Sequence, residues 1–64
     1  MITVNGEKQK YTQLTVQELL VKLELTNILC AIEVNDTLVP HNERNEYILQ
    51  DEDKIEIVSL VGGG

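Results

Sequence analysis

The sequence predicts an α+β fold in which a mixed β-sheet packs against one amphipathic helix. Two observations carry this prediction. Residues 14–25 place apolar side chains at helical spacing, and short stretches on both sides of them alternate apolar and polar residues as strands do. A chain of 64 residues has room for one domain with one thin core. A single helix on one face of a sheet is the two-layer solution at this size.

The first twelve residues are expected to form a β-hairpin. Ile2 and Val4 alternate with polar residues, which is typical of a half-buried strand. The pair Asn5–Gly6 favours a type I′ turn, because both central positions of that turn have positive φ. The returning segment, residues 7–12, is polar, so we expect it at an edge of the sheet.

The helix is predicted from its cap and from its apolar face. Thr15 and Glu18 have the spacing of a capping box. The helix is expected to end by Leu25, before turn residues. Four apolar residues at positions i, i+3, i+4 and i+7 should face the core: Val16, Leu19, Leu20 and Leu23.

The second half of the chain is predicted to return to strands. Residues 30–40 indicate a strand, a tight turn at Asn35–Asp36 and a short strand stopped by Pro40. A polar connection with at most one helical turn follows over 41–46. Residues 47–49 are expected to form a short strand and 50–53 a charged turn. The final strand begins near residue 54 and turns Ile55 and Ile57 inward.

Composition excludes several classes of function. The formal net charge is −6, from eleven acidic and five basic residues. This balance disfavours nucleic acid and favours a basic surface on a protein partner. Cys30 is the only cysteine, so no intramolecular disulfide is possible, and with one histidine no zinc cluster is expected. The sequence has no apolar run long enough to span a membrane and no signal peptide, so we expect a cytoplasmic protein, monomeric when free.

Three sets of polar residues are weak candidates for chemistry. His41 follows a proline and is expected on the surface. Cys30 begins a strand and is expected to act as a small buried hydrophobic residue. The acidic run Asp51–Asp53 could hold a cation, but a solvated turn is the favoured interpretation.

The last strand indicates a contact surface. If Ile55 and Ile57 face inward, Val58 and Leu60 lie where the alternation expects outward, polar residues. We interpret this pair as a partner-binding surface. The alternative is a sheet end that is covered by its own loops.

The three terminal glycines are the strongest candidate for function. Gly62, Gly63 and Gly64 have no Cβ, so a flexible tail over 62–64, attached to a domain over 1–61, could thread a narrow channel of a partner active site. The reactive group would be the carboxylate of Gly64, which adenylation by ATP would convert to a mixed anhydride. The alternative is a frayed or artificial end.

The sequence resembles the ubiquitin-like sulfur carriers, and most closely the ThiS family. The resemblance covers the whole chain and rests on "VNGE", "TVQELL", "AIEVNDTLVP" and "QDEDKIEIVSLVGGG". It implies a β-grasp fold, with four to five strands packed on one helix. Gly63 and Gly64 correspond to the closing glycine pair of the family, and Gly62 is additional. The segment after Pro40 lacks a tryptophan that some members have.

The resemblance also implies a function and partners. An E1-like adenylyltransferase (ThiF) would consume ATP to activate Gly64, and a persulfide from a cysteine desulfurase would supply sulfur. A thiazole synthase (ThiG) would take sulfur from the resulting thiocarboxylate. The chain would be a carrier, not an enzyme, with no bound cofactor and no metal. A molybdopterin synthase small subunit, a ubiquitin-like protein modifier and a plain interaction module stay open as alternatives.

Overall fold

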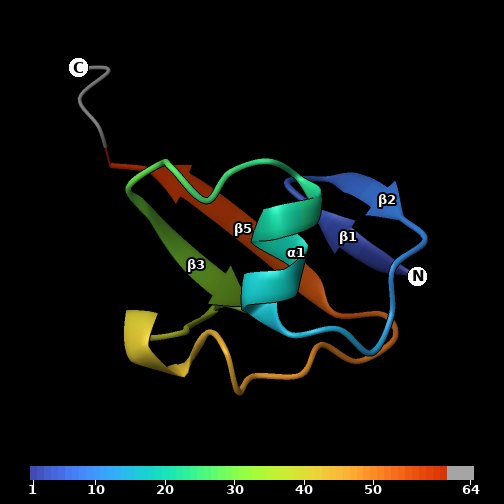
Figure 1. The fold of residues 1–64 in the computed structure, drawn as a ribbon. Coiled ribbons are helices and arrows are strands. Elements are labelled where there is room, and N and C mark those ends of the chain that lie inside the picture. The colour runs from blue at the N-terminus through green and yellow to red at the C-terminus, as the bar shows by residue number, and fades with distance from the viewer. Residues whose placement is uncertain (61–64) are drawn as a thin grey trace.

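The computed structural model describes residues 1–60 (Figure 1). Five strands form one mixed sheet in the order β2-β1-β5-β3-β4, and α1 lies across one face of it (Figure 1). This β-grasp arrangement confirms the predicted fold class. No helix in the described part of the chain is long and apolar enough to cross a membrane. The elements are β1 (Ile2–Val4), β2 (Glu7–Gln9), α1 (Val16–Lys22), β3 (Cys30–Val34), β4 (Thr37–Leu38), η1 (His41–Glu43) and β5 (Lys54–Ser59).

Both predicted hairpin turns are confirmed by their backbone angles. Asn5 and Gly6 have φ of 49° and 87°, and Asn35 and Asp36 have φ of 52° and 69°. These positive values are those of type I′ turns, which match the twist of the flanking strands. As predicted, β2 lies at an edge of the sheet. It ends at Gln9, three residues earlier than expected, because Gln9 already pairs with Ile2, the first residue of β1.

The core lies between α1 and the inner face of the sheet. The helix contributes Val16, Leu19 and Leu20, which are all buried, and Leu23 packs against the cluster while staying partly exposed. Alternation along β1, β3 and β5 sends inward-facing residues into the same core, whereas β2 and β4 contribute no buried residue. The remaining buried apolar residues are Ile2, Val4, Leu14, Cys30, Ile32, Val34, Val39, Leu49 and Ile55.

Both ends of α1 are as predicted. The N–H of Glu18 donates to the Thr15 hydroxyl at 3.1 Å, and the N–H of Thr15 donates to Glu18 Oε1 at 2.8 Å, which completes the capping box. The helix ends at Lys22, before Leu25, as expected. Glu24 has a φ of 59°, and the N–H of Leu25 donates to the carbonyl of Leu20 at 2.9 Å. This Schellman motif ends the helix.

The predicted short strand over residues 47–49 is wrong. The segment makes one isolated bridge, between Thr15 and Ile48, and belongs to no strand of the sheet. Its backbone pairs with the residues that lead into α1: the N–H of Leu49 donates to the carbonyl of Leu14 at 2.8 Å. The apolar pattern was informative about burial, because Leu49 is fully buried in the core.

Candidate functional site

β5 leads the chain toward the terminal glycines, and it is the central strand of the sheet. It runs parallel to β1 and antiparallel to β3 (Figure 1). Cys30 pairs with Ser59 at the end of the β3 ladder, and the N–H of Leu60 donates to the carbonyl of Leu29 at 2.8 Å. Backbone hydrogen bonds therefore hold the chain in place up to Leu60, where the segment toward the glycines begins.

The predicted contact residues lie on the outer face of the sheet, away from α1. Val58 is 53% exposed and Leu60 is 55% exposed. Val58 lies directly opposite Ala31, whereas the neighbouring pair, Ile32 and Ile57, points toward the helix. The predicted orientation of Val58 and Leu60 is therefore present in the fold.

Two exposed leucines that sequence reasoning missed extend this face. Leu29 is bonded to Leu60 through its backbone, and Leu38 pairs with Glu33, which has the same outward orientation as Ala31. The missing signal was the strand register, since only pairing with β5 brings residues 29–38 beside the last strand. We call the resulting group the outer apolar surface: Leu29, Ala31, Leu38, Val58 and Leu60.

A pair of carboxylates lies next to the outer apolar surface. Glu33 on β3 and Glu56 on β5 are directly opposite each other, and both are half-buried. Like charges in direct opposition on a sheet repel each other. This arrangement adds a locally negative region beside the apolar side chains.

The three glycines that the sequence singles out lie outside the described residues. This applies to Gly62, Gly63 and Gly64, as well as to the proposed boundary of the domain at residue 61. Their role stays a prediction from the sequence. We call Leu60, the last residue with a backbone hydrogen bond to the sheet within the described residues, the tail root.

His41 and Cys30 lie where the sequence predicted them, on the surface and in the core respectively. His41 is exposed on η1. Cys30 is buried, with 5% of its surface exposed, beside a small cavity of about 180 Å³ that Leu25, Ile28 and Ile57 help to line. Within residues 1–60, no group of three or more His, Cys, Asp or Glu side chains could hold a metal ion.

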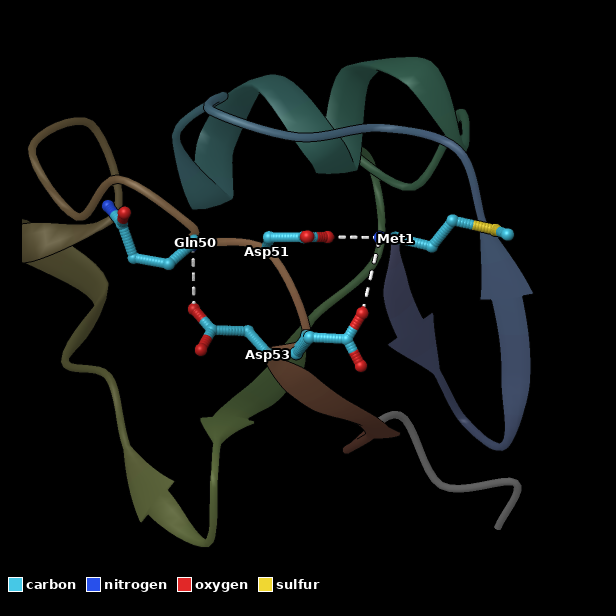
Figure 2. Close-up of polar contacts among 5 residues, drawn as sticks. Met1, Gln50, Asp51 and Asp53 are labelled. Atoms are coloured by element: carbon cyan, nitrogen blue, oxygen red, sulfur yellow. Dashed lines mark hydrogen bonds and ion pairs between the residues drawn. The ribbon is translucent and has the colours of Figure 1, made fainter.

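The acidic turn before β5 binds the amino end of the chain (Figure 2). The terminal ammonium of Met1 pairs with Asp51 and lies 3.7 Å from a carboxylate oxygen of Glu52. The hydrogen bond from the ammonium lowers the pKa of Asp51, and the same bond raises the pKa of the ammonium. Asp53 closes the turn by accepting a hydrogen bond from the N–H of Gln50 at 2.8 Å.

This turn lies at the opposite end of β5 from the tail root. It precedes Lys54, whereas the glycines follow Ser59. The acidic run is therefore a turn whose carboxylates pair with the amino terminus. This agrees with the interpretation that the sequence favoured, which was a turn and not a cation site.

The fold and the site define a class of protein: a ubiquitin-like β-grasp domain whose central strand leads into terminal glycines. The outer apolar surface lies beside the end of this strand. The chain belongs to the ThiS family, whose model matches residues 2–64.

Known proteins agree with this assignment. The chain is 36% identical to the sulfur carrier protein ThiS of Bacillus subtilis, and the match covers 100% of both. It is 39% identical to the uncharacterized protein ycf40 of Porphyra purpurea, over 98% of this chain and 90% of that protein. The crystal structure of the thiamine biosynthesis protein ThiS from Geobacter metallireducens superposes with a TM-score of 0.80 at 27% identity. That match covers 98% of this chain and 97% of the other.

One further relative differs in length. The chain is 34% identical to a thiazole synthase of Paramagnetospirillum magneticum, and the match covers 98% of this chain but 20% of that protein. Together these comparisons confirm the resemblance inferred from the sequence and the sulfur-carrier role in thiamin biosynthesis that it implies.

Proposed function

We propose that the chain carries sulfur as a thiocarboxylate on Gly64 and donates it for formation of the thiazole ring of thiamin. The observation that carries the proposal is the central strand β5, which is hydrogen-bonded up to Leu60 and is followed by a segment that ends in three glycines. A fixed root combined with residues that lack Cβ is suited to delivering a main-chain carboxylate into a narrow active site.

The chemistry requires activation, because a carboxylate is a poor electrophile. A carboxylate oxygen of Gly64 attacks the α-phosphorus of ATP, and pyrophosphate leaves. The sulfur of a persulfide then attacks the carbonyl carbon of the acyl adenylate and displaces AMP. A thiol cleaves the S–S bond of the resulting acyl disulfide, which leaves the thiocarboxylate on Gly64 and a disulfide on the donor.

Each step needs a partner. An adenylyltransferase of the ThiF type binds and consumes the ATP, and a cysteine desulfurase supplies the persulfide. A thiazole synthase of the ThiG type accepts the sulfur. Support for the last partner comes from the similarity of the chain to a segment of a protein named thiazole synthase. A buried, free Cys30 suits a reducing compartment, and we place the cycle in the cytoplasm.

The outer apolar surface is the proposed docking face for the adenylyltransferase. It is continuous with the tail root through Leu60, so docking there would bring the glycines to the partner active site. The adjacent Glu33 and Glu56, with the net charge of −6, favour a partner whose apolar site has basic residues at its rim.

Intact mass spectrometry tests the proposal. The full chain is incubated with its adenylyltransferase, ATP and a persulfide donor, and the expected product has one terminal oxygen replaced by sulfur. A chain that lacks Gly64 serves as the control and should stay unmodified. A full chain that stays unmodified, or that forms an amide with a lysine instead, would contradict the proposal.

A further inference from the structure

Arg44 is a buried cation that lacks a counter-charge within the described residues. It is 7% exposed, and it is the one charged residue among residues 1–60 that is buried. One guanidinium nitrogen, Nη2, donates to the carbonyl of Cys30 at 2.6 Å, while Nε has no partner there. The ion pairs found among residues 1–60 join the amino terminus to Asp51 and Glu52, and none involves Arg44.

The backbone of Arg44 is fixed as firmly as its side chain. Arg44 caps the end of η1: its N–H donates to the carbonyl of His41, the first residue of η1, at 3.3 Å, and its carbonyl accepts from the N–H of Gln17 at 3.0 Å. The residue therefore connects the first turn of α1 to the first residue of β3. With its backbone bonded to two other segments and Nη2 bonded to Cys30, the side chain lies buried between them.

Arg44 helps to line a polar cavity of about 270 Å³. No carboxylate lines it, although the chain has eleven acidic residues. The polar side chains around it come from α1, from the loop before β3 and from the segment around η1, and they offer amide, hydroxyl and imidazole groups. The lining residues are Gln17, Leu20, Leu25, Thr26, Ile28, His41, Arg44 and Asn45.

We propose that this cavity binds a tetrahedral oxyanion of the phosphate class, either free or as the end group of a phosphate monoester. A buried cation is costly unless an anion pairs with it, and charge-assisted hydrogen bonds from a guanidinium are strong. Donors that approach from several elements suit a tetrahedral ion better than a planar carboxylate. None of the residues that line this cavity belongs to the outer apolar surface.

Titration of the full chain with inorganic phosphate tests the proposal. We expect saturable shifts of the NMR signals of the Arg44 Nε–H and of the Thr26 and Asn45 amides, at constant ionic strength set with sodium chloride. At a tenfold excess over Kd, phosphate should raise Tm by about 5 °C or more. Arg44→Met should lose this rise, whereas Lys8→Met, which removes one positive charge from the edge strand β2, should keep it.

Two further measurements keep the test decisive. If Arg44→Met fails to fold, His41→Ala, at an exposed position of the cavity, should raise Kd several-fold. Methyl phosphate is titrated in parallel: binding similar to that of phosphate supports the monoester form, and binding of phosphate alone supports the free ion. Shifts that do not saturate, or an equal rise in Tm for wild type and Arg44→Met, would overturn the proposal.

Discussion

The side chain of Asn5 hydrogen bonds to both backbone groups of Ile57. Asn5 Oδ1 accepts from the N–H of Ile57 at 2.7 Å, and Nδ2 donates to its carbonyl at 3.2 Å. β1 ends at Val4, so the side-chain amide continues the ladder that the β1 backbone can no longer supply. The turn residue of the first hairpin thus holds the last strand three residues before the tail root at Leu60.

Removing this amide should destabilise the end of β5. We expect Asn5→Gly to lower the free energy of unfolding by about 1–2 kcal/mol, because two hydrogen bonds are lost while positive φ stays accessible. Asn5→Ala should cost about 1 kcal/mol more, since φ at this position is 49°. Urea unfolding measures both changes, and hydrogen exchange of the Ile57 amide reports the local effect. Wild-type stability in Asn5→Gly would show that the amide bonds contribute nothing.

Glu24 occupies a position where helices usually have glycine. Its φ of 59° follows the last turn of α1, in the Schellman motif that ends the helix. We expect Glu24→Gly to raise the free energy of unfolding by about 0.5–1 kcal/mol, because glycine relieves the cost of the left-handed conformation. Glu24→Gln is the matched control, since it removes the charge and keeps that cost. An equal gain in both variants would assign the effect to charge alone.

The ion pair between Met1 and Asp51 should stabilise the fold within a window of pH and lose its effect both above and below that window. The raised pKa of the ammonium means that its contribution is complete below the ordinary value of 8.0 and is lost as pH rises through the raised value. The lowered pKa of Asp51 means that its contribution is present above 3.8 and is lost as pH falls through the lowered value. The stability difference between wild type and Asp51→Asn should therefore be largest between these limits. Chemical denaturation across pH measures it, and a flat difference would contradict the pairing.

Local patterns predicted most of the fold because local chemistry determines those elements. The two tight turns and the capping box at Thr15 depend only on residues that are close in sequence, and all three were predicted. The end of α1 before Leu25 was predicted, but the positive φ of Glu24 that follows it was not, because this conformation is unusual for its residue type. The pairing of residues 47–49 with the approach to α1 was missed because an apolar run indicates burial but does not identify its hydrogen-bond partner.

The candidate site was predicted in part for the same reason. Alternation along β5 was enough to predict that Val58 faces outward. The position of Leu29 and Leu38 on the outer apolar surface depends on strand order, which the sequence pattern does not give. Arg44 was missed entirely. Its segment is polar, and no local signal distinguishes an arginine that enters the core from the solvent-exposed residues beside it.

Changes to the outer apolar surface should weaken docking more than folding. We expect Val58→Asp or Leu60→Asp to raise the Kd for the adenylyltransferase about 10–100-fold, because each places a charge in an apolar contact. Stability should change by about 0.5 kcal/mol or less, since both side chains are more than half exposed. Val21→Asp is the control: Val21 is 58% exposed on α1, across the molecule from this surface. Calorimetric titration measures Kd, and equal weakening by all three variants would place the docking face elsewhere.

Substitutions among the glycines should change the adenylation rate without changing the stability of the domain. We expect Gly63→Val to lower the adenylation rate about 100-fold or more, because a branched side chain would misplace the carboxylate in a narrow channel. Gly62→Val, at the glycine beyond the closing pair, should have a smaller effect. Pyrophosphate exchange with the adenylyltransferase measures both rates. Deleting Gly64 should abolish exchange and leave cooperative unfolding intact, because the buried core lies within residues 2–55. Normal exchange by Gly63→Val would rule out a channel that excludes side chains.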